Sequence, residues 1–335
     1  MKGHIVISEC HDPCKNLAAE EYLFDYVEKN NCLILYIWQN DKAVIIGRHQ
    51  NAYTECNLSY AKSKNIKVIR RKSGGGAVYQ DLGNINFTFI TPKNFYDINR
   101  STQVIIRALQ KLNISVAANG RNDICLLPDG EKISGNAYRS KNNVGMHHGT
   151  ILFDTNFDEM EKVLCVSPKK LAKRAISSVR SRVANILQYY PSLTIPTVQE
   201  NIISEFAEEY NLKNLIPLEI SSADFLPYIE TYCNDDWNIG LFPNYEITVQ
   251  TQFEWGNLTF GLTMKNNYPR ALYIETDAPD IEDITLAEKK INEELAKDNS
   301  NLREIFYRNI FHCIKSQVMA NDFIFLFNTI QLNET

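Results

Sequence analysis

The sequence lacks the long hydrophobic runs of a membrane-spanning protein. Its 335 residues include no apolar stretch of about 18 residues, the length that a spanning helix needs. Its first residues, MKGHIVISECHDPCKN, show neither the apolar core of a secretory signal nor the Arg- and Ser-rich pattern of a transit peptide. We therefore expect a cytoplasmic protein that does not enter membranes.

Paired cysteines are absent as well. The eight cysteines are spread thinly, and no two of them form a C-x-x-C. Cys10 and Cys14 are the closest pair, and His4 and His11 lie near them, but this set matches no standard zinc spacing. We expect reduced thiols, without a metal site at these residues and without a structural disulfide.

The chain carries little net charge. Its 35 Lys and Arg against 40 Asp and Glu give a formal net charge of −5, which argues against a general nucleic-acid-binding protein. Residues 246–335 carry 8 basic and 14 acidic side chains (net −6), whereas residues 1–245 carry 27 and 26 (net +1). Together with the Gly, Pro and Asn of Asn238–Asn244, this shift predicts two domains, residues 1–245 and 246–335.

The spacing of apolar residues predicts an α+β fold. Few helical segments separate neighbouring strand-like runs in the larger domain, which favours mostly antiparallel sheets packed with helices over a doubly wound parallel sheet. The smaller domain is expected to be a small α+β accessory unit. The expected strands are 32–38, 43–47, 67–71, 77–81, 85–91, 123–127, 132–138, 145–153, 258–264 and 271–275, and the expected helices include 16–29, 102–112, 284–297, 302–317 and 322–328.

Several motifs that mark catalysis or nucleotide binding are missing. The chain has no G-x-x-x-x-G-K-[ST] loop, no G-x-G-x-x-G turn, no G-x-S-x-G elbow and no H-E-x-x-H. No local spacing marks a Ser or Cys nucleophile. The sequence therefore gives no support to covalent catalysis by a triad.

A glycine triplet behind three basic residues is present instead. In RRKSGGGAVYQD (residues 70–81), consecutive glycines after an expected strand allow backbone N–H groups to approach an anion, and the upstream Arg and Lys suit phosphate. The alternative is a flexible surface turn with solvated charges. The position directly before another expected strand favours the anion site.

A second segment, residues 122–139, contains the turn signal Pro-Asp-Gly at 128–130. Lys132 would begin the returning strand, with Ser134 on the same face by the period of two. Lys132 is a compact cation that can bridge a phosphate and a carboxylate, although taken alone it fits a solvated strand lysine better. Two further segments are His147-His148, whose side chains should point to opposite faces of a strand, and the basic stretch Pro168–Arg182.

The basic stretch Pro168–Arg182 has six basic residues and no acidic one. It fits a solvated helix face, a docking surface for an acidic partner, or a site for a polyphosphate. These three readings stay open on the sequence alone.

Together these segments resemble the lipoate–protein ligase A family, which shares a fold group with the biotin ligases. The resemblance covers most of residues 1–190 and weakens in the C-terminal part. The segments that carry it are GRHQNAYTECN (47–57), RRKSGGGAVYQDLGNINFTF (70–89), NDI (122–124), GEKISGNAYR (130–139), HHGT (147–150), SVRSRVANI (178–186) and, more weakly, FEWGNLTFGL (253–262).

The resemblance implies an ATP-dependent lipoate–protein ligase. Lipoate would be activated to lipoyl-AMP and then transferred to a specific lysine of an acceptor, either an apo lipoyl domain of a 2-oxoacid dehydrogenase complex or the glycine-cleavage H protein. ATP and lipoate would be substrates, Mg²⁺ is expected with ATP, and no metal ligands can be named. Residues 1–245 would form the catalytic domain that binds lipoate and ATP, and residues 246–335 the accessory domain.

Site residues follow from the same resemblance. Lys132 would be the catalytic residue, placed between the lipoate carboxylate and the α-phosphate. The residues implied at ATP or lipoyl-AMP are Arg71, Gly76, Ala77, Val78, Tyr79 and Lys132. Those implied at lipoate are Ser73, Gly75, Asp123, Ser134 and His148. Gln80 departs from the family, where many relatives have His, and this leaves any proton-transfer role of that position in doubt.

Two other functions stay open. A lipoyl or octanoyl transferase (amidotransferase) of the same fold would act without ATP. The form that works through a cysteine thioester needs a reactive cysteine upstream of the lysine motif, where residues 113–124 have none, and Cys125 lies in an apolar run that raises a thiol pKa. A non-catalytic lipoyl-domain-binding protein is disfavoured by Arg71, the glycine triplet and Lys132.

Overall fold

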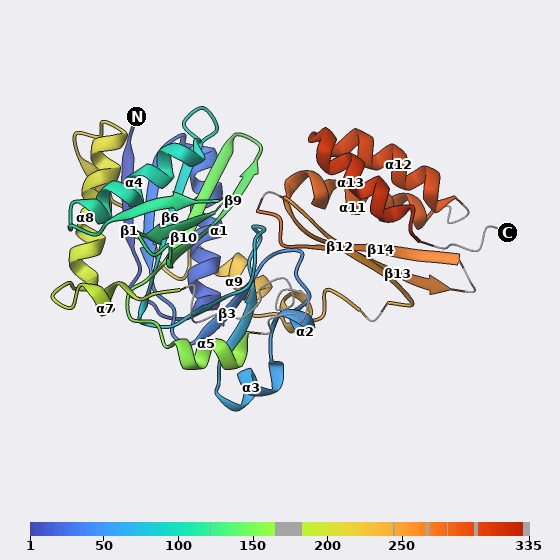
Figure 1. Cartoon of the computed structure of the whole chain (residues 1–335). Helices are drawn as coiled ribbons and strands as arrows, with labels where there is room; N and C mark the ends of the chain where they lie inside the picture. Colours follow the sequence, from blue (N-terminus) through green and yellow to red (C-terminus); the bar gives the residue numbers. More distant parts are fainter. Residues whose placement is uncertain are drawn as a thin grey trace.

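The computed structural model describes residues 1–120, 122–164, 183–243, 245–265, 268–279, 281–297 and 301–330. The described chain has an N-terminal part built on a large sheet and a C-terminal part beside it (Figure 1). The large sheet has the strand order β11 (Leu215–Pro217), β1 (Gly3–Ile7), β2 (Leu33–Trp38), β6 (Asn84–Pro92), β10 (Val144–Leu152), β9 (Lys132–Lys141), β8 (Asp123–Leu126) and β7 (Val116–Asn119).

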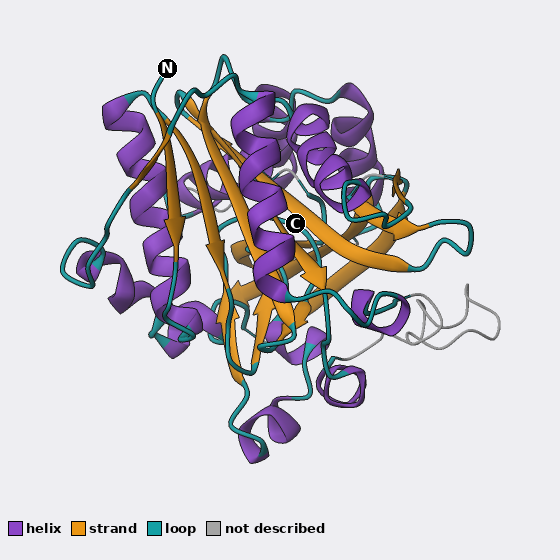
Figure 2. Ribbon diagram, turned by 90° about the vertical axis from the view of Figure 1, so that its left-hand side faces the viewer, coloured by secondary structure: helices purple, strands orange, loops and turns teal. Residues whose placement is uncertain are grey.

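The predicted α+β class with mostly antiparallel pairing is confirmed. In the large sheet β1 runs parallel to β2 and β11, and every other neighbouring pair is antiparallel. Every residue of β2, β6 and β10 is buried, because helices cover both faces (Figure 2). One core lies between the sheet and helices α4 (Ile98–Gln110) and α8 (Ile195–Glu209), and another between the sheet and α1 (Pro13–Asn30) and α9 (Leu226–Tyr232).

Helix α1 begins three residues earlier than its apolar spacing predicts. The Asp12 carboxylate accepts from the amide N–H groups of Cys14 and Lys15, and Pro13 has the φ that the first helical position requires. The helix ends at Asn31, which adopts a left-handed conformation with φ of 49°. The other helices that the structure describes in the N-terminal part are α2 (Ala52–Glu55), α3 (Leu58–Ser63), α5 (Phe157–Val163), α7 (Ile186–Tyr189) and α10 (Asp235–Asn238).

A small sheet presents the glycine-rich segment. Its order is β4 (Lys67–Arg70), β3 (Ala43–Ile46) and β5 (Val78–Gln80), with β3 parallel to β4 and antiparallel to β5. Residues 71–77 therefore cross from one edge strand to the other over the end of β3. This crossing places the glycines at the end of the small sheet, where Gly74 and Gly75 are buried and Gly76 is partly exposed.

The C-terminal part has its own sheet and its own apolar core. Strands β12 (Ile247–Phe253), β13 (Gly256–Lys265) and β14 (Tyr268–Thr276) pack against helices α11 (Glu282–Leu295), α12 (Leu302–Cys313) and α13 (Gln317–Phe327). Strand β12 is not among the expected strands, because its Thr and Gln residues give it little apolar character. The division at residue 245 stays a prediction about domain organisation.

No helix within the described ranges is long and apolar enough to cross a membrane.

The two parts meet at the polar turn that follows β3. The His49 ring lies against the Ile274 carbonyl oxygen, at 2.8 Å from Nδ1, and against the Thr285 hydroxyl, at 2.9 Å from Nε2. A second contact joins the Gly75 amide N–H to the Ala278 carbonyl oxygen, at 2.8 Å. The C-terminal part therefore touches the glycine-rich segment directly.

A buried carboxyl group at this junction predicts a pH dependence of stability. Burial raises the pKa of Glu288 from 4.5 to about 7, opposed by the Ile274 amide N–H and by Arg48. A carboxyl whose pKa is raised in the folded state stabilises the fold below its unfolded pKa, and this contribution is lost as pH rises through about 7. His49, whose pKa burial lowers to about 3, acts in the opposite direction and only below pH 6.5.

We therefore expect Tm of the wild type to fall between pH 6.5 and pH 8 by about 2 °C, from a loss of at most about 1 kcal/mol. Glu288→Gln should remove this decline, since glutamine does not titrate. Calorimetric Tm values across that interval check it. An equal slope for both proteins would show that Glu288 does not titrate there.

Candidate active site

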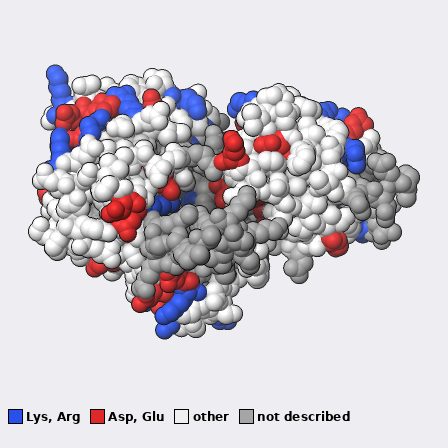
Figure 3. All heavy atoms as spheres, viewed as in Figure 1, with Lys and Arg blue, Asp and Glu red and all other residues white. Residues whose placement is uncertain are grey.

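A cavity of about 750 Å³ lies between the large sheet, the small sheet and the C-terminal part. Figure 3 shows the corresponding face hollowed between the two parts. Its wall on the large sheet is a row of residues paired across five strands: Trp38 with Asn86, Asn86 with Thr150, Thr150 beside Gly135, and Gly135 with Asp123. Because paired residues point to the same face of a sheet, the register places this row along one wall.

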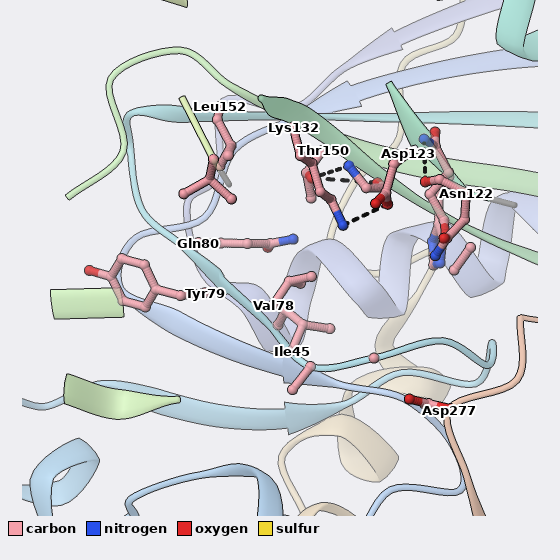
Figure 4. Close-up of a pocket in the computed structure, with 18 of the residues that line it drawn as sticks. Ile45, Val78, Tyr79, Gln80, Asn122, Asp123, Lys132, Thr150, Leu152 and Asp277 are labelled. Atoms are coloured by element: carbon pink, nitrogen blue, oxygen red, sulfur yellow. Dashed lines mark hydrogen bonds and ion pairs between the residues drawn. The ribbon is translucent and has the colours of Figure 1, made fainter. Parts of the chain in front are cut away.

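Lys132 and Asp123 form an ion pair at one end of this row. Their Nζ and Oδ1 atoms are 2.7 Å apart, and both side chains are 33% exposed (Figure 4). A Cβ added at Gly135 would lie 3.0 Å from Lys132 Nζ, so glycine there leaves room for the lysine side chain. Lys132 presents its ammonium group to the cavity, and the Asp123 carboxylate beside it holds that group in place.

Arg71 is fully buried beneath the glycine-rich loop. Its guanidinium donates to the carbonyl oxygens of Ile45 (3.0 Å), Gly74 (2.5 Å from Nη2) and Gly76 (2.9 Å), and to the Ser73 hydroxyl (3.0 Å). Burial lowers the pKa of Arg71 to about 10, so it stays charged at neutral pH. Arg71 lines the cavity, but most of its donors hold the loop backbone.

The glycine-rich loop forms part of the cavity wall. Gly75 has φ of +86°, a conformation that residues with a Cβ rarely adopt. Gly76, Ala77 and Val78 line the cavity, and no acceptor within the described ranges takes a hydrogen bond from the Gly76 or Ala77 amide N–H. Two adjacent amide N–H groups without acceptors form a nest that suits an anion such as phosphate.

The expected site residues differ in how they meet the cavity. Most of them line it: Arg71, Gly76, Ala77, Val78, Tyr79, Asp123, Lys132 and His148. Ser73, Gly75 and Ser134 do not line it. Figure 4 shows the Tyr79 ring directed away from Lys132.

The period-of-two argument for Ser134 is wrong. A register shift next to Lys132 pairs Cys125 with Lys132 and Ile124 with Ser134. Ile124 belongs to the core beneath α4, so its partner Ser134 faces that core and is fully buried. A register shift of this kind, as in a β-bulge, gives no signal in the spacing of apolar residues.

His147 and His148 point to opposite faces of β10, as predicted. His147 contacts the Ser101 hydroxyl and the Asn136 side-chain oxygen within the core, and burial lowers its pKa to about 3. His148 faces α1 and the cavity. The described residues hold no group of three His, Cys, Asp or Glu suited to a metal ion.

Gln80 is held by other side-chain amides. Its oxygen accepts from Asn40 (2.8 Å) and its nitrogen donates to the Asn86 oxygen (2.7 Å). Gln80 lines the cavity as part of a buried amide chain, and it has no titrating group to offer.

Sequence reasoning missed part of the cavity wall. Trp38, Asn86, Asn122 and Thr150 line it from the large sheet, and Gln252, Asn257 and Asp277 line it from the C-terminal part. Asn86, a side-chain amide in a run otherwise made of Ile, Phe and Thr (residues 85–91), was a usable signal; the C-terminal residues had none. The basic stretch Pro168–Arg182 lies outside the described residues.

Comparisons with known proteins agree with this architecture. The family model described as the lipoyl protein ligase A/B catalytic domain matches residues 12–207. A curated relative from Blochmanniella pennsylvanica, lipoate-protein ligase A, is 35% identical over 297 residues, which are 86% of this chain and 87% of that relative.

Solved structures show the same likeness. LipL1 of P. falciparum in complex with lipoate has a TM-score of 0.77 at 26% identity, covering 96% of this chain and 98% of that one. A bi-partite lipoate protein ligase from Thermoplasma acidophilum, described with its E2 lipoyl domain, has a TM-score of 0.65 at 26% identity, covering 74% and 100%. A lipoate-protein ligase A bound with ATP has a TM-score of 0.61 at 25% identity, covering 72% and 100%.

Proposed function

The chain belongs to the lipoyl protein ligase A/B family, and from this premise we propose that it is an ATP-dependent lipoate–protein ligase. It activates lipoate to lipoyl-AMP with release of pyrophosphate. It then transfers the lipoyl group to a lysine of an acceptor protein, forming an amide and releasing AMP. The observation that carries the proposal is one cavity with the Lys132 ammonium on one wall and the Gly76 and Ala77 amide N–H groups on another.

This arrangement suits adenylation. Negative charge builds on the α-phosphate as the lipoate carboxylate attacks it, and a compact ammonium ion beside both groups stabilises that charge. The loop N–H groups bind phosphate oxygens, and Asp123 keeps Lys132 in position. The chemistry needs positioning and exclusion of water, and it needs no covalent nucleophile on the enzyme.

Mg²⁺ is proposed to accompany ATP. Proteins commonly hold this ion through one or two carboxylates together with substrate phosphates, so the lack of a three-ligand cluster in the described ranges fits. Asp123 is the carboxylate that would hold it, since it lines the cavity next to Lys132. Bound there, the ion would neutralise phosphate charge.

Transfer without ATP is the competing function. Cys125 lines the cavity, and among the described residues it is the feature that favours a thioester route. Burial raises the pKa of its thiol, which disfavours the thiolate nucleophile that this route requires. We therefore prefer the hypothesis of an ATP-dependent ligase.

One assay separates these functions. The protein is incubated with lipoate and an apo lipoyl domain, with and without ATP and Mg²⁺, and the acceptor is weighed by mass spectrometry. A lipoyl mass gain that requires ATP supports the ligase. Transfer from a lipoylated donor protein without ATP would instead establish the amidotransferase.

The acceptors are proposed to be apo lipoyl domains of 2-oxoacid dehydrogenase complexes, the glycine-cleavage H protein, or both, in the cytoplasm. The T. acidophilum relative described with its E2 lipoyl domain supports the first class. Parallel assays with the two apo acceptors decide between them.

The basic stretch Pro168–Arg182 is proposed to steer an acidic acceptor, because its six positive charges have no local acidic partners. Replacing Lys169 and Lys170 with glutamate should raise KM for the acceptor and leave adenylation unchanged. The defect should shrink with added salt, since exposed charges are screened beyond roughly 8 Å at physiological ionic strength. Equal loss of both half-reactions would assign the stretch to the nucleotide site.

A further inference from the structure

Helix α1 places two consecutive glutamates inside the protein. Glu20 is 4% exposed and Glu21 is 6% exposed, and a buried carboxylate is costly unless it is paired. Glu21 pairs with Lys72, at 2.8 Å, and with Arg139, at 2.6 Å. Lys72 directly precedes Ser73, so α1 contacts the start of the glycine-rich loop through Glu21.

Glu20 reaches the same loop through a histidine. Its Oε1 accepts from the Thr88 hydroxyl at 2.7 Å and lies 2.9 Å from His148 Nδ1. The other ring nitrogen, Nε2, lies 2.7 Å from the Ser73 hydroxyl oxygen. These side chains connect α1, β6 and β10 to the segment that precedes the glycine triplet.

The hydrogen-bond directions follow from the donors available. The carboxylate of Glu20 only accepts, so His148 donates from Nδ1; in the ring with one proton, Nε2 then accepts from the Ser73 O–H. The Ser73 oxygen then accepts from Arg71 Nε at 3.0 Å. Arg71 in turn donates to the carbonyl oxygens of Gly74 and Gly76. Each hydrogen bond of this series therefore joins a donor to an acceptor.

We infer that Glu20 is a positioning residue for nucleotide activation, acting on the glycine-rich loop through His148, Ser73 and Arg71. The inference rests on the proposed function and deepens it. Arg71 holds the carbonyl oxygens of Gly74 and Gly76, and the amide N–H groups of Gly76 and Ala77, which line the cavity, have no acceptor within the described ranges. Glu20 also supplies the negative charge that favours the buried Arg71 guanidinium.

In this arrangement Ser73 and His148 position the glycine-rich loop, a role distinct from direct polar contact with lipoate. Both ring nitrogens of His148 and the Ser73 hydroxyl are engaged within the series. Their loss should therefore weaken the use of ATP more than the use of lipoate. A role as polar lipoate ligands predicts the reverse.

The test is a double-mutant cycle with Ser73→Ala and Glu20→Ala, read as lipoate-dependent exchange of pyrophosphate into ATP. Each variant should raise KM for ATP about 10-fold, with KM for lipoate changed less than about threefold. The two residues do not touch, yet the double variant should be within about twofold of the worse single one, because both break one series. If the two substitutions acted independently, their effects would multiply, and the double variant would raise KM for ATP about 100-fold.

Two further variants guard against a general structural effect. Glu20→Gln keeps an oxygen that accepts from His148, so it should restore KM for ATP to within about threefold of wild type. Glu205 lies on α8, is 1% exposed and pairs with Arg107 on α4 and with Lys111 just after α4. Glu205→Ala removes this buried carboxylate, which does not line the cavity. It should lower Tm and leave KM for ATP unchanged.

The outcomes are separable. A larger rise in KM for lipoate than for ATP, or multiplicative effects, would overturn the role of Glu20. Ser73→Ala removes a single oxygen and decides this alone if Glu20→Ala does not fold. If the wild type shows no lipoate-dependent exchange, the proposed function fails; calorimetry of ATP binding to wild type and Ser73→Ala then judges the series, and equal affinities would overturn it.

Discussion

Replacing Lys132 with alanine should lower the rate of adenylate formation by about 10²–10³-fold. The Lys132 ammonium is the cation that lies on the cavity wall 2.7 Å from Asp123, where charge would build on the α-phosphate. The fold should be retained, since the side chain is 33% exposed and its removal leaves no cavity in a core. Lipoate-dependent exchange of pyrophosphate into ATP measures this step.

Lys141→Ala is the matched control for Lys132→Ala. Lys141 ends the same strand, β9, at an exposed position, so its removal tests the loss of a lysine from that strand without touching the cavity. It should exchange pyrophosphate at the wild-type rate. An exchange rate for Lys132→Ala within about threefold of wild type, under 1 kcal/mol of barrier, would reject the catalytic role of Lys132.

Gly75→Val should cause the second large loss, a fall in kcat/KM for adenylation of about 100-fold or more. Gly75 has φ of +86°, which a β-branched residue adopts only under strain. Its Cβ would also lie 2.9 Å from Arg71 Nη2 and 3.4 Å from the Ala137 Cβ. The substitution therefore displaces the guanidinium that holds the loop and narrows the space beside Ala137, where lipoate is expected.

Gly120→Val separates these two causes. Gly120 also has a positive φ, of +66°, but a Cβ there meets nothing within 4 Å. It should show comparable backbone strain, measured as a lower Tm, with adenylation kinetics close to wild type. Normal calorimetric affinities of Gly75→Val for both lipoate and ATP would contradict the proposed role of the loop.

Much of the secondary structure was readable from the sequence because it depends on local pattern. The runs predicted at residues 85–91 and 145–153 match β6 and β10 to within one residue at each end. Their Ile, Phe and Thr content and the turn residues around them mark them as strands, and both strands are buried on both faces. Chemistry near the glycine triplet and Lys132 was readable for the same reason: both combine unusual residues with turn signals over short spans.

Tertiary structure determined which face of the sheet those side chains occupy and which groups they bond. A period of two cannot reveal the register shift beside Lys132 that turns Ser134 into the core. Arg71 looked like a phosphate ligand, yet the fold buries it and assigns its donors to the loop backbone. A buried polar group must find its partner among whatever segments the fold brings near, and that partner can be far away in the chain.

The same reason explains what no local pattern could supply. Glu20 meets His148 across 128 residues, and Gln252, Asn257 and Asp277 join the cavity only because the C-terminal part packs against the glycine-rich loop. Residue type and spacing determined that this chain would carry a cationic, glycine-rich site on an α+β scaffold. Cross-strand register and the pairing of distant buried charges determined the shape of that site, because both minimise unpaired polar groups over the whole fold at once.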